Sequence, residues 1–514
     1  MTIFSDFKRV ALQQPDSPAV IMQDSQVSYS AVLKLSEQIA GGLLKVGFHK
    51  GDRVAIHIGN RPELISVYYA CLQIGAVILP ISLRLSGGEI KYLLSHGAAR
   101  FYLGDAELYE RWTDAVNQNN TIEYAWVLDL SISNGRAKPW KELLSDTGFA
   151  PVEVRPDDIS SIFYTSGTTG LPKAIAYSHA TLSNALDLMD HTLDSTKDPR
   201  SARGDAVHSM VDVISPWTIL ALLTGLRRGR PAAITPTHNG DVVLALLNKH
   251  QIGWLGGAPS NFAALVSEIR RVGANAPDLS ETNCVSGGDS CPVDLAKAFF
   301  DIFKANLQSS YGLTETCGPV TFQPNLNAVD APSIGWPLPG VEIKIDAPTG
   351  EAGELFLRSP ARPIGFWNGS SVDACDTERW LPSGDYVQQR SDGCLIFLGR
   401  KKDDFMVEGY PVSPLDVEKK LVENADIAAA IVFGVPDEIK GERGIAIVEA
   451  IPGRQLSAQD IMAHLSGRMA NYKLPREIYI MEKLPFGANG KRSRKQLTAD
   501  YAVSAGPFSK QKEI

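Results

Sequence analysis

The chain has 514 residues, more than one hydrophobic core usually organises, so the sequence predicts at least two domains. Hydrophobic residues make up 44% and charged residues 21% of the chain, a composition typical of globular proteins that argues against a fibrous or disordered one. The formal net charge is −8, whereas proteins that bind nucleic acid usually carry a basic face, so we expect no nucleic-acid partner.

The cysteines and the N-terminal residues indicate the compartment. No two of the six cysteines have the C-x-x-C spacing of a zinc or redox site, and so long a chain with so few cysteines does not favour a disulfide framework. The first residues lack a cationic leader followed by an apolar run. The longest apolar stretch, residues 214–226, is interrupted by polar residues and is too short to span a bilayer. We therefore expect a cytoplasmic protein without a membrane span.

Strand-like and helical patterns alternate through the first part of the chain. Residues 54–58 form a short apolar run typical of a buried strand, and residues 63–74 carry apolar side chains at helical spacing. Residues 76–80 return to a strand pattern. Strand–helix–strand units of this kind predict a mostly parallel sheet that is covered by helices.

The pattern changes after residue 400. Residues 412–421 and 458–469 are typical of helices, whereas 428–434 and 444–450 are typical of strands. We predict an α/β protein in which residues 1–399 form a large N-terminal domain of mostly parallel sheets and helices. A charged hinge over residues 400–404 would then lead to a small, mobile α+β domain over residues 405–514.

A loop rich in glycine and hydroxyl groups directly follows the apolar run of residues 159–164. Its sequence is T-S-G-T-T-G-L-P-K, and its spacing, G-x-x-G-x-x-K, differs from that of a Walker loop. The glycines let the backbone approach an anion, while the hydroxyls and the lysine ammonium can donate to phosphate oxygens. An ordinary surface loop is the alternative. The candidate phosphate-binding residues are Thr165, Ser166, Gly167, Thr168, Thr169, Gly170 and Lys173.

Further motifs follow in a fixed order along nearly the whole chain. They are S-G-G-D at 286–289, Y-G-L-T-E-T at 311–316, W-L-P-S-G-D at 380–385, G-R at 399–400 and G-K-R-S-R at 490–494. Together with the glycine-rich loop, this ordered set resembles the adenylate-forming superfamily. That superfamily includes acyl-CoA synthetases, the adenylation domains of peptide synthetases and firefly luciferase. One departure is Ser383, where relatives usually have threonine.

The resemblance implies that the chain binds ATP and Mg²⁺. Tyr311 would stack on adenine, Thr314 would bind the α-phosphate, and Glu315 would hold Mg²⁺, which prefers carboxylate and phosphate oxygens. Asp385 would accept the ribose hydroxyls, and Arg400 would reach ribose or phosphate oxygens. The other residues that the resemblance places at the nucleotide are Gly287, Gly288, Asp289 and Gly312.

The resemblance also identifies Lys491 as the catalytic lysine, beside Thr314, Glu315 and Arg400. A carboxylate and a triphosphate repel each other, and an ammonium between them stabilises the transition state. The carboxylate would then attack the α-phosphorus, and Mg²⁺ would neutralise charge on the departing pyrophosphate. Lys402 matches the hinge at which the small domain of relatives rotates between the two half-reactions.

The acyl pocket is expected around Asp212, Trp254, Gly256 and Gly257. The small residues there would leave room for a ring or a branched chain on a small-molecule carboxylic acid. Two interpretations of Asp212 remain open. Asp212 either binds an amine group of the substrate, as an aspartate does in relatives that activate amino acids, or lies outside the pocket of an enzyme for other acids.

The acceptor of the acyl group also remains open. Relatives that use CoA often show Gly-Gly-Glu-Asn after the hinge, whereas this chain has Glu408-Gly-Tyr-Pro411, and proline lacks an N–H donor. The preferred prediction is an acid–thiol ligase that uses CoA or the phosphopantetheine of an acyl carrier protein. The first alternative is a ligase that passes the acyl group to an amine, as coronafacate-ligase-like members do. The second is a non-catalytic nucleotide-binding homologue.

Overall fold

The computed structural model describes most of the chain. The described residues are 2–83, 85–165, 172–193, 206–273, 275–289, 291–324, 333–376, 378–407, 410–437, 441–466, 468–469, 471–484 and 494–503. They divide into two compact units. Unit 1 contains Met1–Glu342 and Arg358–Arg379, and unit 2 contains Ile343–Leu357 and Trp380–Ile514.

This division differs from the predicted boundary at residue 399. Residues 343–357 and 380–399 belong to unit 2. The physical reason is strand pairing, because β18 (Ala352–Arg358) pairs with β21 (Leu381–Gln389), which in turn pairs with β22 (Leu395–Arg400). The hinge predicted at residues 400–404 concerns a rotation, so it stays a prediction.

The first sheet of unit 1 contains the predicted strand–helix–strand unit. Arg53–His57 and Val77–Pro80 form parallel strands, and a helix over Pro62–Ile74 connects them. This helix begins with a proline in its first turn and ends at Gly75, whose φ of 69° suits glycine. The strand order is β20 (Val372–Ala374), β19 (Gly365–Trp367), β9 (Lys173–Ser178), β8 (Ile159–Thr165), β4 (Val77–Pro80), β3 (Arg53–His57), β5 (Phe101–Asp105), β6 (Tyr124–Leu128) and β7 (Ala137–Pro139).

A second sheet of unit 1 has a parallel centre and antiparallel strands at both ends. Its order is β16 (Ser333–Pro337), β15 (Gly318–Gln323), β14 (Leu307–Leu313), β13 (Asn283–Gly287), β12 (Ile252–Gly257), β10 (Ala206–Ser209), β11 (Ala232–Ala233), β1 (Pro18–Ile21) and β2 (Gln26–Ser28). The pairs from β14 through to β1 are parallel. We therefore expect the carboxyl ends of β10, β12, β13 and β14 to lie along one edge of the sheet.

Helices connect and cover these strands. Before β8 the helices are α1 (Ile3–Gln13), α2 (Tyr29–Lys45), α3 (Pro62–Ile74), α4 (Gly87–His96), α5 (Ala106–Arg111) and α6 (Thr113–Asn117). After β9 they are α7 (His179–Leu193), α8 (Pro216–Arg227), α9 (Gly240–Lys249), α10 (Pro259–Val272) and α11 (Val293–Phe303).

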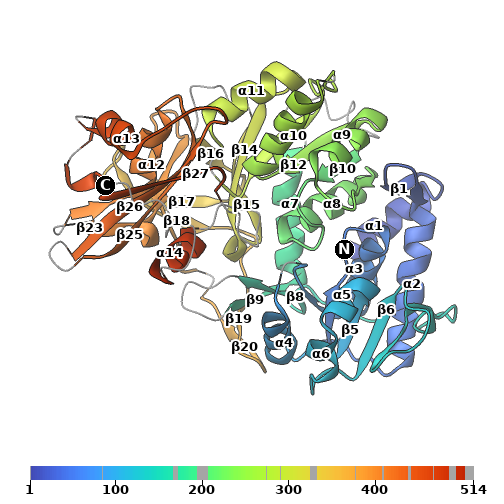
Figure 1. The fold of residues 1–514 in the computed structure, drawn as a ribbon. Helices are drawn as coiled ribbons and strands as arrows, with labels where there is room; N and C mark the ends of the chain where they lie inside the picture. The colour runs from blue at the N-terminus through green and yellow to red at the C-terminus, as the bar shows by residue number, and fades with distance from the viewer. Residues whose placement is uncertain are drawn as a thin grey trace. The chain divides into compact units, whose positions relative to one another are not determined.

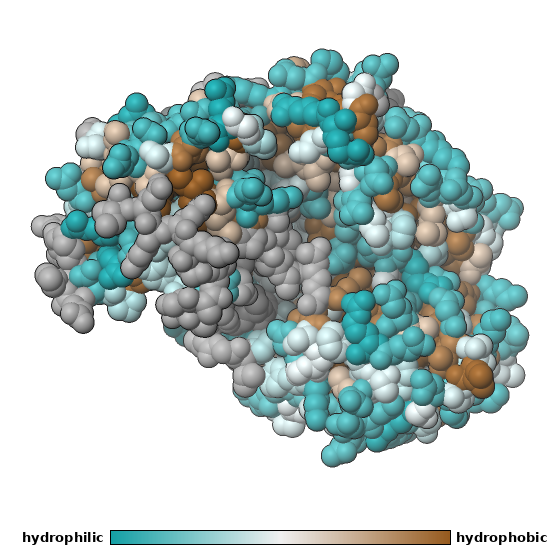
Figure 2. Space-filling view, in the orientation of Figure 1, coloured by the Kyte–Doolittle hydropathy of each residue, from teal (hydrophilic) through white to brown (hydrophobic). Residues whose placement is uncertain are grey.

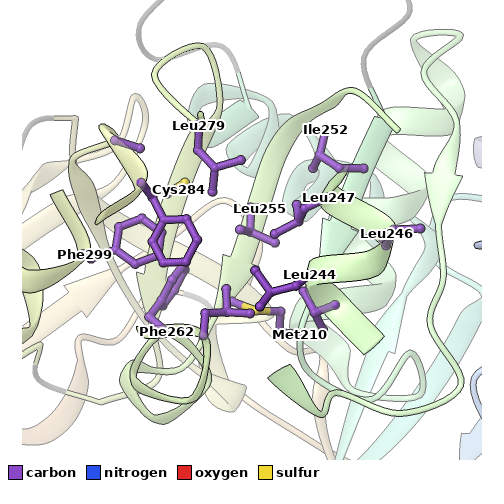
Figure 3. Close-up of a cluster of buried hydrophobic side chains, with 14 of the residues drawn as sticks. Met210, Leu244, Leu246, Leu247, Ile252, Leu255, Phe262, Leu279, Cys284 and Phe299 are labelled. Carbon is purple, nitrogen blue, oxygen red and sulfur yellow. The ribbon is translucent and has the colours of Figure 1, made fainter. Parts of the chain in front are cut away.

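A large cluster of apolar side chains forms the core between α9, α10, α11 and one face of the second sheet. These helices lie along the same side of β12 and β14 (Figure 1). Figure 3 shows Leu244 and Leu247 of α9 directed toward Leu255 of β12. The rings of Phe262 and Phe299 meet edge to face, with their centroids 5.2 Å apart. This packing fixes one face of β12 and β13, and the opposite face remains for other contacts.

Unit 2 contains the predicted small α+β domain. Its sheet has the order β24 (Tyr410–Val412), β23 (Phe405–Val407), β26 (Gly441–Ala450) and β25 (Ile427–Asp437), and β27 (Glu477–Met481) pairs in parallel with β26. The helices are α12 (Pro414–Val422), α13 (Ala458–Leu465) and α14 (Arg494–Val503). The two predicted helices and two predicted strands are confirmed, although α12 begins later and α13 ends earlier than expected.

Hydrophilic side chains cover most of the molecular face in Figure 2, and hydrophobic ones lie in small groups between them. Within the described part of the chain, no helix is both long enough and apolar enough to cross a bilayer.

Candidate active site

The strand ends of the second sheet bring the predicted acyl and adenine residues of unit 1 together. Gly257 ends β12 and lies beside Ser286 of β13, and Gly287 pairs with Ser310 of β14. Trp254 and Gly256 lie in β12, Gly288 and Asp289 follow β13, and Tyr311 and Gly312 lie in β14. The edge at the carboxyl ends of parallel strands is the usual ligand-binding edge of an α/β sheet.

A tight turn after β14 carries Thr314 and Glu315. It is a short 3-10 helix, η2 (Thr314–Thr316). The Thr316 hydroxyl donates to the Leu313 carbonyl at 2.9 Å and accepts from the Leu313 N–H at 3.0 Å. A Cβ atom at Gly312 would lie 2.1 Å from the Gly318 carbonyl oxygen, so only glycine lets the chain return so closely. The turn is therefore held rigidly from both ends.

Tyr177 joins this turn to the strand that follows the predicted phosphate loop. Its hydroxyl donates to the Thr314 carbonyl, and its ring is buried in β9. Burial raises the pKa of Tyr177 well above its usual value, and the nearby Cys317 and Glu315 raise it further, so the hydroxyl keeps its proton and remains a donor. Because β9 and β14 belong to different sheets, this bond links the two sheets of unit 1. The sequence analysis missed Tyr177, since an isolated tyrosine in a strand carries no motif.

The predicted phosphate loop connects β8 with β9. Thr165 is the last residue of β8 and pairs with Lys173, the first residue of β9, in an antiparallel arrangement. Lys173 is exposed. Ser166, Gly167, Thr168, Thr169 and Gly170 lie outside the described residues, so their predicted contacts with phosphate stay predictions.

Glu315 is the only carboxylate predicted to hold a metal. Among the described residues, no group of three or more histidine, cysteine, aspartate or glutamate side chains could hold an ion by itself. A single carboxylate suits Mg²⁺ nonetheless, because Mg²⁺ is commonly bound by one or two carboxylates together with substrate phosphates. Glu315 lies near Tyr177, and hence near the strand that begins at Lys173.

The space beside Gly256 and Gly257 is filled by side chains of the protein itself. A Cβ atom at Gly256 would lie 2.2 Å from Cη2 of the buried Trp254, and one at Gly257 would lie 2.8 Å from Cε of Met210. The positions directly beside these two glycines are therefore taken, and the prediction of an acyl pocket around them remains untested. A glycine indicates a close approach, but its sequence position does not identify the group that approaches.

Asp212 lies beside a histidine that the sequence analysis missed. Its Oδ1 is 3.3 Å from Nε2 of His238, close enough for an ion pair when the ring is protonated. The amide of Asn60 lies 3.0 Å from the same Nε2, and Asn60 is oriented by accepting the Val213 N–H at 2.9 Å. Since His238 and Asn60 lie in distant parts of the sequence, no spacing could have revealed this cluster.

Asp385 and Arg400 come together in unit 2. They are paired residues of β21 and β22, and Nε of Arg400 lies 3.2 Å from Oδ1 of Asp385. The Asp385 side chain is 2% exposed, whereas that of Arg400 is 41% exposed, so the guanidinium keeps donors at the surface. The Asp385 N–H donates to the Ser383 hydroxyl at 3.0 Å, a bond that the usual threonine could also accept.

The predicted hinge and catalytic lysine also belong to unit 2. The backbone of Lys402 lies in a 3-10 turn, η3 (Lys401–Asp403), and Lys491 lies outside the described residues. Three residues after Lys491, Arg494 begins α14. Its guanidinium binds Asp403 at 2.5 Å, Glu418 at 2.6 Å and the Val432 carbonyl at 2.7 Å. The start of α14 is thus attached directly to η3, the turn that contains Lys402.

Two family models match the chain. The model described as AMP-binding enzyme matches residues 7–367, and the model described as AMP-binding enzyme C-terminal domain matches residues 416–491.

Individual proteins match over nearly the whole chain. The structure of coronafacic acid ligase from Pectobacterium brasiliense is 40% identical with a TM-score of 0.80, and the match covers 98% of each chain. The fatty acid–[acyl-carrier-protein] ligase ScoC from Streptomyces coeruleorubidus is 27% identical, over 95% of this chain and 94% of that protein. The amide bond synthetase McbA from Marinactinospora thermotolerans has a TM-score of 0.82 over 97% of this chain and 99% of its own, but at 22% identity the likeness shows the fold alone.

Replacing Tyr177 with phenylalanine removes the bond to Thr314 while keeping the ring. We expect this change to weaken binding of ATP with Mg²⁺ about fivefold, the equivalent of about 1 kcal/mol, because the turn is no longer held against β9. Isothermal titration calorimetry measures the effect. Tyr102→Phe is the matched control, since Tyr102 is also buried and its hydroxyl bonds with the ring of His57, away from the turn. Equal effects of the two changes would contradict a specific role for Tyr177.

Proposed function

This chain belongs to the AMP-binding enzyme family and is an adenylate-forming ligase that uses ATP; from that premise we propose that it joins a carboxylic acid to an amine, forming an amide. In the first half-reaction the carboxylate attacks the α-phosphorus of ATP, and the bond to pyrophosphate breaks. In the second, the amine attacks the acyl carbon, AMP leaves with the bonding electron pair, and the amine loses a proton. No thiol takes part.

The observation that carries the first half-reaction is the bond between Tyr177 and Thr314. It places the turn with Thr314 and Glu315 beside β9, which begins directly after the glycine-rich loop. We propose that the α-phosphate lies at Thr314 and the β- and γ-phosphates at the loop and Lys173. When bound, Mg²⁺ supplies positive charge at the departing pyrophosphate, held by Glu315 and phosphate oxygens.

Two observations favour an amine as acceptor. The coronafacic acid ligase is 40% identical, whereas the carrier-protein ligase is 27% identical. Residues 408–411 lack the paired glycines of relatives that use CoA, and Pro411 has no N–H to offer a pantetheine chain. Transfer to the thiol of CoA or of a carrier protein is the second candidate. It is favoured by the carrier-protein ligase and by a feruloyl-CoA synthase from Amycolatopsis, each 27% identical over nearly all of this chain.

The acceptor is tested by product mass. The protein would be incubated with ATP, Mg²⁺ and a panel of aliphatic, cyclic and aryl acids, in parallel with amino acids, CoA or a phosphopantetheine-loaded carrier protein. We expect amide products with the amino acids and no thioester above the level of the uncatalysed reaction. Thioester formation without any amide would overturn the amine proposal while leaving acid activation intact.

Replacing Lys491 with alanine tests the two half-reactions separately. We expect acid-dependent exchange of pyrophosphate into ATP to fall at least about a hundredfold, because the two anions then approach without the ammonium between them. Transfer from chemically supplied acyl-adenylate should persist. Lys483→Ala is the control, since Lys483 is an exposed lysine of the same region. Equal loss of both half-reactions would argue against alternation of the small domain.

Replacing Asp212 with alanine tests the class of acid. Because His238 already lies against this carboxylate and is itself contacted by Asn60, we propose that Asp212 does not bind a substrate ammonium and that the acid is not an amino acid. We expect the change to alter kcat/KM for an uncharged acid by less than about tenfold. Loss of a charged contact with the substrate would lower kcat/KM by more than this. The assignment would be contradicted if the wild-type protein released pyrophosphate with an amino acid as the activated acid and Asp212→Ala abolished that release.

A further inference from the structure

Two glycines lie on the same face of the second sheet at its carboxyl edge. Gly256 pairs with Val285 in the neighbouring strand, and Gly287 follows Val285 by two residues. Since side chains alternate along a strand, Gly256, Val285 and Gly287 face the same side. That side is opposite to Leu255 and Cys284, which pack into the core shown in Figure 3.

The ring of Trp217 lies over both glycines. A Cβ atom at Gly256 would lie 3.1 Å from Cη2 of Trp217, and one at Gly287 would lie 3.4 Å from its Cζ2. The ring also meets Trp254 edge to face, with centroids 5.6 Å apart at 62°. The space that the missing side chains leave is therefore occupied by two indole rings, and Trp217 spans two adjacent strands.

The backbone of Trp217 is held in place from several sides. It is the second residue of α8, which starts with Pro216 after the N-cap Ser215. The next residue, Thr218, donates its hydroxyl to the Val211 carbonyl at 3.1 Å and bonds with the Ser209 hydroxyl at 2.8 Å. These contacts fix the first turn of the helix against the end of β10.

Trp217 and Trp254 differ in access. Trp254 is completely buried, whereas Trp217 is only partly buried. Of the two rings, Trp217 is thus the one that a ligand can touch without displacing the core.

The position of Trp217 coincides with the junction of two predicted subsites. A Cβ atom at Gly287 would also lie 3.1 Å from the carbonyl oxygen of Ser310. Ser310 directly precedes Tyr311. Trp217 therefore lies between the strand expected to carry adenine and the strand expected to line the acyl group.

We propose that Trp217 forms the end wall of the acyl pocket and limits the protein to compact acids. The inference rests on the proposed function, which it makes more specific. An acid with a single ring or a short branched chain ends before the indole, whereas a long linear chain must displace a ring that has no space to move into beside Gly256. The substrate class is thus a compact, uncharged carboxylic acid, and long-chain fatty acids are excluded.

The test compares acid preference in variants of the full chain. Pyrophosphate release would be measured with linear acids from acetate to dodecanoate and with cyclopentanecarboxylate and benzoate. We expect Trp217→Ala to raise kcat/KM for octanoate relative to cyclopentanecarboxylate at least about tenfold, because the wall retreats by an indole ring. Trp217→Phe should shift the same ratio less. Trp126→Ala is the matched control, since Trp126 is a buried tryptophan of the other sheet.

The outcomes distinguish the two proposals. If the wild-type protein releases no pyrophosphate with any acid, the proposed function and this inference both fail. If the wild-type protein is active and the folded Trp217→Ala protein keeps the same preference, the inference alone is overturned. Trp217→Leu provides the same comparison should the alanine variant not fold.

Discussion

The hydrogen bond from Tyr177 to the Thr314 carbonyl joins the two sheets of unit 1, and the candidate site is built around it. One partner lies in the strand that begins after the glycine-rich loop, and the other begins the turn that carries Glu315. Tyr177 is buried and Thr314 is half-buried, so breaking the bond would leave a buried hydroxyl without its partner, which costs free energy. The same bond that joins the two sheets therefore also holds the turn with Thr314 and Glu315, at which we propose that the phosphates and Mg²⁺ bind.

The proposed chemistry gives a reason why Lys491 belongs to unit 2 and not to unit 1, which carries Thr314 and Glu315. Two anions must come together during activation, and a fixed cation would hold them equally well before and after reaction. Under the proposed mechanism, the ammonium of Lys491 would act in the first half-reaction and would not be needed in the second. Arg494 binds Asp403, so the start of α14 and the 3-10 turn η3 are in contact within unit 2.

The sequence was informative where a local pattern has a direct physical meaning. Alternating apolar runs predicted β3, α3 and β4, and the apolar run before the glycine-rich loop forms β8. It was uninformative where residues far apart in the chain meet. Gly256 was expected to leave room for an acyl group, and nothing in the sequence indicated that the ring of Trp254 approaches it or that Asp212 lies beside His238. The pairing of β18 with β21 likewise moved residues 380–399 into unit 2, because composition alone does not reveal which segments pair.

A crystal structure with a non-hydrolysable acyl-adenylate analogue would test the central claim most directly. The account predicts the adenine ring against Tyr311, the sulfamoyl or phosphoryl group within hydrogen-bonding distance of Thr314, and the acyl group ending at the indole of Trp217. An analogue bound away from the turn that Tyr177 holds would contradict the account.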